Sequence, residues 1–159
     1  MQIFSTTIAA LALLAASTNA STMLRQESEG SSSCTLTGTY KSGTDISSCS
    51  TVTIGSLSVP AGVTLDLSKA KTGATIEFTG TTTFGTAKWD GPLVLLTGSS
   101  LTVKGSGTLD GQGSWYWKQG TSISRPVFFR MNKVLSSTVS GFTLKNMPYR
   151  TFSILNSQK

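Results

Sequence analysis

Histidine is absent from this chain of 159 residues, and cysteine occurs only twice. Two thiolates cannot complete the four ligands of a tetrahedral zinc site, so the sequence predicts no metal centre and no cofactor. Acidic residues are also scarce, and the complete set is Glu27, Glu29, Asp45, Asp66, Glu77, Asp90 and Asp110. No two of them are adjacent, so the sequence contains no local pair of carboxylates.

The chain also has few charged residues and no long segment with a helical period. Charged residues make up only 13% of the chain and hydrophobic residues 38%, whereas disordered chains combine low hydrophobicity with high net charge. No segment after residue 20 shows a sustained helical period. The length suits one ordinary domain. Together with the abundance of Gly, Ser and Thr, this composition favours an all-β domain.

The N-terminus contains a short apolar run at residues 8–16. It is too short to span a bilayer, and small residues ending at Ala20 follow it, which is typical of a cleaved secretory signal; a buried helix is the alternative. We therefore expect a signal peptide at residues 1–20, a pro-segment or flexible arm at 21–33, and one domain at 34–159 of a secreted, extracellular protein. In that compartment Cys34 and Cys49 are expected to form a disulfide.

Short apolar stretches separated by Gly, Ser, Thr and Asn fill the rest of the chain. They lie at residues 51–57, 63–67, 74–78, 93–97, 101–104, 127–131, 138–140, 142–145 and 152–155. Many alternate between apolar and polar residues, which predicts short strands with one inward face.

The spacing of these strands separates two all-β architectures. Phe128 and Phe152 lie in similar strands 24 residues apart, with two further short strands between them. This spacing fits one coil of a parallel β-helix, in which stacked coils bury a continuous apolar column. A β-sandwich also has short strands at regular intervals, so the pattern alone leaves both open.

Several sequence motifs carry a family resemblance. They are LSVPAGVTLDL at residues 57–67, FTGTTTFG at 78–85, WDGPL at 89–93, GSGTLDGQG at 105–113, RP at 125–126, NMP at 146–148 and FSI at 152–154. In this order, from about Cys34 to Leu155, they resemble the opening coils of the polygalacturonase (pectinase) family, glycoside hydrolase family 28. The resemblance implies a right-handed parallel β-helix, truncated after its N-terminal coils, and hydrolysis of α-1,4-galacturonosyl bonds in pectin. It also places Cys34 and Cys49 where the family has its N-terminal disulfide.

The catalytic motifs of that family are missing. Inverting glycosidases need carboxylic acids on both faces of the sugar. The family supplies them in an Asn-Thr-Asp stretch and an Asp-Asp pair, with Gly-His-Gly and Arg-Ile-Lys motifs that hold the substrate, and none of the four occurs here. We therefore expect no catalytic residue in this chain and no activity of the chain alone. Asp110 stands before a glycine and is expected to bond nearby backbone N–H groups in a turn; Trp115 and Trp117 are expected to pack rather than to stack on sugars.

Arg150 is the candidate substrate-binding residue. The stretch at residues 146–150 aligns with a family stretch of the form Asn-Thr-Pro-Val-Gln whose last residue faces the cleft, although three of the five positions differ. A guanidinium there could hold a galacturonate carboxylate through two hydrogen bonds, and a solvated surface arginine is the alternative.

The distribution of charge also suggests a partner. Residues 100–159 carry eight basic residues against Asp110 alone, which would attract a polyanion. Pectin or polygalacturonate fits, and no motif supports nucleic acid or a membrane. The function expected from the resemblance is pectin hydrolysis, with this chain representing the N-terminal portion. The alternatives are a secreted, non-catalytic pectin binder and a decoy for a polygalacturonase-inhibiting protein or a receptor of the full enzyme.

Overall fold

The computed structural model describes residues 32–159, so the expected signal peptide and most of the expected arm lie outside the described residues. Within them the chain forms twelve strands and one short helix. The strands are β1 (Ser33–Thr39), β2 (Thr51–Val59), β3 (Leu65–Leu67), β4 (Thr75–Phe78), β5 (Thr81–Phe84), β6 (Val94–Ser99), β7 (Thr102–Gly105), β8 (Thr108–Asp110), β9 (Phe129–Leu135), β10 (Thr138–Val139), β11 (Thr143–Lys145) and β12 (Phe152–Leu155), and the helix is α1 (Gly113–Trp117).

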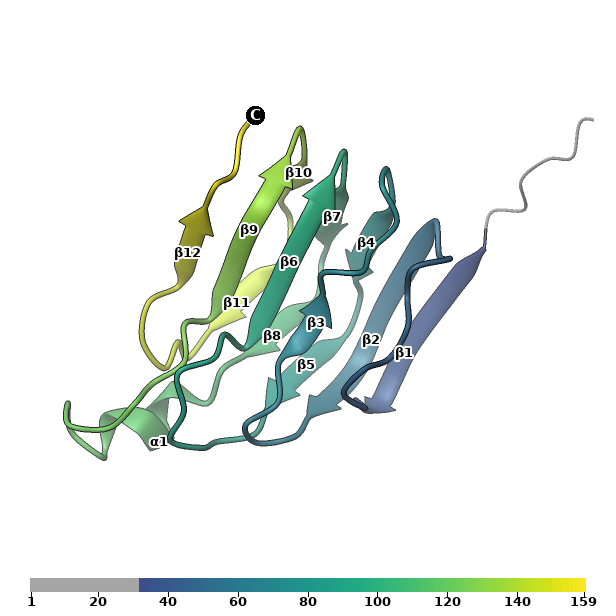
Figure 1. Cartoon of the computed structure of the whole chain (residues 1–159). Helices are drawn as coiled ribbons and strands as arrows, with labels where there is room; N and C mark the ends of the chain where they lie inside the picture. The colour runs from purple at the N-terminus through teal and green to yellow at the C-terminus, as the bar shows by residue number, and fades with distance from the viewer. Residues whose placement is uncertain (1–31) are drawn as a thin grey trace, which may run out of the picture.

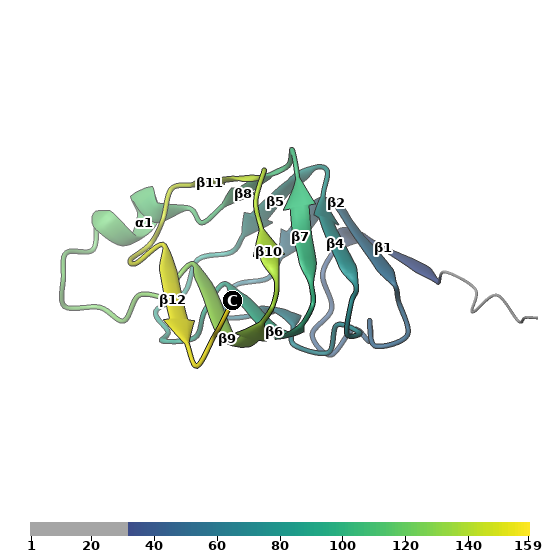
Figure 2. The same cartoon turned by 90° about the horizontal axis from the view of Figure 1, so that it is seen from above.

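The strands stack as the coils of a parallel β-helix (Figure 1). β12, β9, β6 and β3 form one sheet. In the other sheet β4 pairs with one end of β2 and is followed by β7 and β10, while β5 pairs with the other end of β2 and is followed by β8 and β11. All strand pairs are parallel, and Figure 2 shows the successive coils lying side by side, from β1 on the right to β12 on the left. The expected all-β, parallel β-helical fold is therefore confirmed, and the sandwich alternative is wrong.

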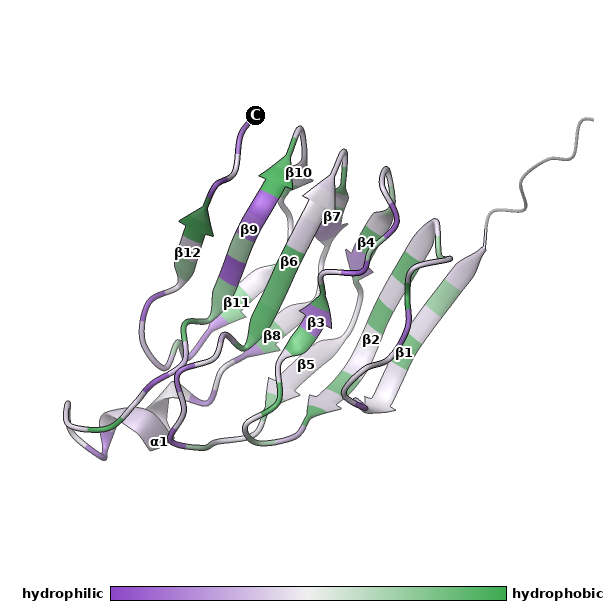
Figure 3. Ribbon diagram, in the orientation of Figure 1, coloured by the Kyte–Doolittle hydropathy of each residue, from purple (hydrophilic) through white to green (hydrophobic). Residues whose placement is uncertain are grey.

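The core is an interior column of side chains from successive coils. On the smaller sheet Leu65, Val94 and Phe129 occupy the same register on β3, β6 and β9, and all three are fully buried. On β3 and β9 the polar residues Asp66 and Arg130 alternate with these positions, and Figure 3 shows purple bands along both strands, whereas on β6 the corresponding residue is Leu95. Burying one such side chain contributes about 1.5–3 kcal/mol relative to leaving it exposed, so the column accounts for much of the stability of the coils.

One sequence-based expectation, the register of the last coil, needs correction. Phe152 pairs with Phe129 and not with Phe128, so this coil is one residue shorter than the expected spacing of 24 residues. The two short strands expected between them, at residues 138–140 and 142–145, are present as β10 and β11.

Three strands and the helix were not expected from the apolar pattern. β1 begins at Ser33, the last residue of the expected arm, while β5 is rich in threonine and β8 is the short stretch Thr-Leu-Asp. In β5 the buried residues are Thr82 and Phe84. The apolar pattern missed this strand because one of its two buried side chains, Thr82, is polar. None of the helical structure in residues 32–159 reaches the length and hydrophobicity needed to cross a membrane.

The two ends of the described solenoid differ. At the β1 end, the loop before β2 buries Tyr40 and Ile46 against the core, and the Tyr40 hydroxyl accepts a hydrogen bond from the Asp66 N–H at 3.2 Å. At the β12 end, Phe152 is 46% exposed and Ile154 61% exposed, although they pair with the buried Phe129 and the half-buried Met131 of the coil before. The last described coil thus presents apolar interior positions to solvent.

Candidate functional site

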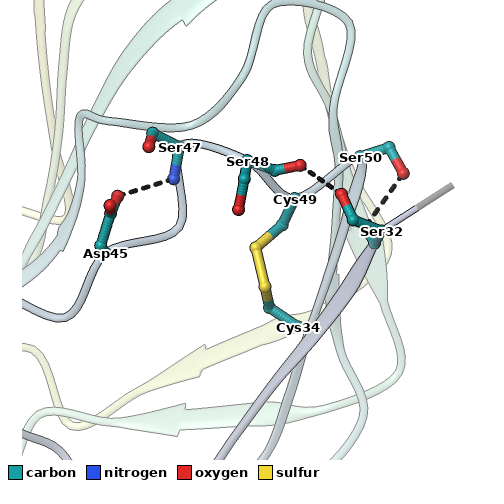
Figure 4. The surroundings of a disulfide bond; sticks show 7 residues. All are labelled: Ser32, Cys34, Asp45, Ser47, Ser48, Cys49 and Ser50. Carbon is teal, nitrogen blue, oxygen red and sulfur yellow. Dashed lines mark hydrogen bonds between the residues drawn. A yellow bond between two sulfur atoms is a disulfide. The ribbon is translucent and has the colours of Figure 1, made fainter. Parts of the chain in front are cut away.

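The disulfide expected between Cys34 and Cys49 is present (Figure 4). Cys34 lies on β1 and the fully buried Cys49 directly precedes the neighbouring strand β2, which brings the two Cα atoms to 5.8 Å. The Ser32 hydroxyl donates to the Ser48 carbonyl, and the Ser50 hydroxyl donates to the Ser32 carbonyl at 3.0 Å. The bridge therefore ties the first strand of the described chain to the first full coil.

Asp110 ends strand β8 and is held by three donors. Its Oδ1 accepts hydrogen bonds from the Gln112 N–H at 3.1 Å and the Asn146 side-chain amide at 2.9 Å, and its Oδ2 lies 3.1 Å from the Lys145 ammonium. Burial raises the pKa of Asp110, but the hydrogen bonds from Asn146 and Gln112 together with the charge of Lys145 outweigh it, so the pKa lies below the ordinary 3.8. The bond to Gln112 confirms the expected turn role, and the engagement of both oxygens leaves a structural clamp between β8 and β11.

The aromatic residues of helix α1 have different environments. Tyr116 is fully buried, and its hydroxyl accepts a hydrogen bond from the Ala87 N–H at 3.3 Å. The half-buried Trp115 packs edge-on against Tyr116, with 5.0 Å between the ring centroids. Trp117 is 54% exposed and donates its indole N–H to the Met147 carbonyl at 3.1 Å. Trp115 thus packs as expected, while Trp117 is held at its indole nitrogen and leaves half of its surface to solvent.

Arg150 lies at the surface in the connection between β11 and β12, where Pro148 is buried and Tyr149 is exposed. Its guanidinium carbon is 5.2 Å from the centroid of the Tyr149 ring, a cation–π geometry. Its carbonyl accepts a hydrogen bond from the Phe128 N–H at 2.9 Å, which fixes the backbone of this connection on the preceding coil. Among residues 32–159 no carboxylate lies within ion-pair distance of Arg150, so its charge is available to a ligand.

A pocket of about 290 Å³ adjoins this connection and was not expected from the sequence. It is lined by Asp90, Thr121, Ile123, Ser124, Arg125 and Tyr149. The half-buried Arg125 donates from Nη2 to the Gly120 carbonyl, while its buried Nε–H has no hydrogen-bond partner. The sequence signals at this place were WDGPL at residues 89–93, the Arg-Pro pair at 125–126 and the stretch at 146–150. The first two served as parts of a motif and not as a candidate site.

The described residues provide neither a metal site nor a carboxylate pair. No group of three or more His, Cys, Asp or Glu side chains in residues 32–159 could hold a metal ion. Asp110 forms the one ion pair found in this part of the chain, and its partner Lys145 is half-exposed. The arrangement around Tyr149 can therefore bind an anionic ligand through Arg125 and Arg150, and it offers no pair of acids flanking a glycosidic bond.

Comparisons with known proteins agree with this fold. Residues 49–159 match glycosyl hydrolases family 28, and the chain belongs to that family. It is 43% identical over 152 residues to endopolygalacturonase I of Aspergillus oryzae and 39% identical over 152 residues to endopolygalacturonase I of Aspergillus niger. It is also 40% identical over 131 residues to a polygalacturonase of Penicillium janthinellum, which covers 79% of this chain and 35% of that protein. For the two Aspergillus proteins the match covers 92% of this chain but only 41% of each relative.

Proposed function

We propose that this chain is the galacturonan-binding N-terminal portion of a secreted polygalacturonase-type glycoside hydrolase of family 28. Pectin, and in particular its polygalacturonate backbone, is the proposed substrate. The observation that carries the proposal is Arg150, whose exposed guanidinium has no carboxylate partner within residues 32–159 and which belongs to the stretch that aligns with a cleft-lining family motif. A guanidinium can hold a carboxylate in two parallel hydrogen bonds, and each galacturonate unit of the polymer offers one carboxylate.

Hydrolysis itself is proposed to require residues that this sequence does not contain. The reaction needs one acid to protonate the leaving oxygen and a second carboxylate to activate water on the other face of the ring. Asp110 is the most buried acidic residue of the described chain, and both of its oxygens already accept hydrogen bonds or an ion pair. We therefore expect this chain to retain polygalacturonate without cleaving it.

The extracellular location and a second partner are part of the same proposal. The apolar run at residues 8–16 supports export, and the disulfide between Cys34 and Cys49 supports an oxidising compartment. An inhibitor protein directed at polygalacturonases is the proposed protein partner, because most of this chain aligns with such enzymes at an identity of 40% or more.

The test measures binding and cleavage in the same sample. The secreted chain is passed over immobilised polygalacturonate and over a neutral galactan of similar length, and reducing ends are assayed in the eluate. We expect retention on polygalacturonate alone and no reducing ends above a control without protein. Release of reducing ends would contradict the proposed inactivity, and equal retention on both matrices would contradict recognition of the carboxylates.

A matched pair of arginine variants localises the binding. Arg150→Ala should reduce retention more than Arg130→Ala, because Arg130 lies on β9 beside Ser153 of β12, within an ordinary coil. Equal losses would show that diffuse charge alone retains the chain. The melting temperature of each variant serves as the control for folding.

A further inference from the structure

The pocket beside Tyr149 is formed by segments that are distant in the sequence. Asp90 precedes β6, Thr121 to Arg125 belong to the connection between α1 and β9, and Tyr149 lies between β11 and β12. Figures 1 and 2 show the α1 connection projecting sideways from the coils at the same end as the β11–β12 connection. Three successive coils thus contribute to one concave site.

Arg125 is the residue that indicates a ligand. Its Nη2 donates to the Gly120 carbonyl, and its buried Nε–H has no acceptor within residues 32–159, although buried donors are almost always paired. The buried nitrogens Arg130 Nε and Trp89 Nε1 also have no partner there, but neither residue lines the pocket. Because Asp90 also lines the pocket and forms no ion pair with Arg125, the guanidinium charge is not cancelled within the described chain. An acceptor that enters the pocket would satisfy a donor and a charge together.

The other lining groups restrict the chemistry of that acceptor. Asp90 brings a negative charge and can accept hydrogen bonds from hydroxyl groups, whereas Thr121 and Ser124 offer hydroxyls that donate or accept. Tyr149 offers a ring that is 54% exposed. A doubly charged oxyanion would be repelled by Asp90, and a neutral sugar would leave Arg125 without a counter-charge. One carboxylate on a ring that carries hydroxyls satisfies all of these groups.

The size of the pocket points to a single ring. Its volume of about 290 Å³ lies at the lower limit of small-molecule pockets, which begin near about 300 Å³. We propose that this pocket is a binding site for one uronate residue, with its carboxylate on Arg125, its hydroxyls on Asp90 and its ring against Tyr149. The proposal rests on the proposed function, because it takes the uronate from the same galacturonan chain that Arg150 contacts.

The experiment titrates the ¹⁵N-labelled full chain with trigalacturonate and follows the Nε–H resonance of Arg125 by NMR, with dissociation constants from calorimetry. We expect this resonance to shift on binding. Arg125→Gln should raise the dissociation constant about tenfold or more, because it removes a charge-assisted hydrogen bond. Asp90→Ala, which removes the acceptor for the sugar hydroxyls, should also raise the dissociation constant, but by less than Arg125→Gln because no charge-assisted hydrogen bond to the carboxylate is lost. Lys104→Gln, an exposed residue of β7 outside the pocket, is the matched control and should leave the constant within about twofold.

The outcomes separate this inference from the proposed function. If the chain is retained on polygalacturonate but Arg125→Gln binds trigalacturonate like the original chain, the pocket assignment is wrong and the proposed function stands. If neither trigalacturonate nor polygalacturonate binds, both fail. A shift of the Arg125 resonance by sulfate at the same concentration as trigalacturonate would identify a general anion site and overturn the uronate assignment. A melting temperature of Arg125→Gln close to that of the original chain excludes misfolding as the cause of a loss.

Discussion

Replacement of Asp110 tests whether its carboxylate is a structural clamp. Asp110→Ala removes the acceptor of the Gln112 N–H and of the Asn146 amide, and it also removes the ion-pair partner of Lys145. Hydrogen bonds to a charged group contribute about 1.5–3 kcal/mol each. The loss is smaller here, because Gln112 is half-buried and Asn146 is exposed, so both donors can form hydrogen bonds with water instead. The half-exposed Lys145 adds at most about 1 kcal/mol. We expect Asp110→Ala to lower the free energy of unfolding by about 2–3 kcal/mol.

Two further variants divide this effect between the contacts. Asp110→Asn keeps an oxygen for Gln112 and Asn146 and loses the ion pair, so it should lower the free energy of unfolding by about 1 kcal/mol. Lys145→Met should change it by less than about 1 kcal/mol, because it removes the ion pair alone. Urea unfolding followed by circular dichroism measures all three, and the Ala variant should shift the midpoint by about 1 M or more.

The pH dependence of unfolding independently tests whether the Asp110 carboxylate stabilises the folded chain. The pKa of Asp110 is lower in the folded chain than in the unfolded chain, so its contribution is fully present above the unfolded value of about 3.8 and is lost as the pH falls through the folded value. The stability difference between the original chain and Asp110→Ala should therefore shrink below about pH 4. A stability of Asp110→Ala equal to that of the original chain at pH 7 would refute the clamp.

Three other predictions concern the disulfide, the core and the exposed end. Under denaturing conditions without reductant, Cys34 and Cys49 should take up no alkylating reagent by intact mass, and uptake of two groups would contradict the bridge. Thr82→Val should raise the free energy of unfolding by about 1 kcal/mol, because the buried Thr82 hydroxyl has no hydrogen-bond partner in residues 32–159. A lower free energy of unfolding for this variant would show that the hydroxyl makes a stabilising contact. The exposed Ile154 end should associate as salt screens the basic surplus, and sedimentation should show larger species growing with salt and fewer of them for Ile154→Ser. A monomer at every salt concentration would contradict the last expectation.

Much of the fold could be predicted because the β-helix repeats an apolar pattern along the chain. Each of the nine apolar stretches overlaps a strand of the structure, since alternation places one set of side chains in the interior. β5 was missed because Thr82 counts as polar in such a pattern although it is fully buried. The register at Phe129 was misjudged by one residue because adjacent phenylalanines at 128 and 129 are both buried, and only the strand pairing distinguishes them.

The candidate site was predictable only where its contacts are local. The bond from the Gln112 N–H to Asp110 spans two residues, and an Asp-Gly sequence indicates it. The contacts of Asp110 with Lys145 and Asn146 depend on the pairing of β8 with β11, which the sequence does not specify without the register of the coils. The pocket with Arg125 is harder still, because it needs three connections from different coils to meet. Sites formed by residues from different coils therefore could not be predicted from this sequence.

The structure shows which basic residues are free to attract a polyanion. Lys145 is neutralised by Asp110, so it contributes little to the attraction of a polyanion, whereas Arg150 lies over the Tyr149 ring and Arg125 is half-buried in the adjoining pocket. Positive charge near Tyr149 is thus held by fixed side chains, and the desolvated part of such charge is screened by salt less than charge on mobile surface lysines. If galacturonan binding persists at salt concentrations that abolish diffuse attraction, the fixed arginines around Tyr149 account for it, and net charge serves only to speed the encounter.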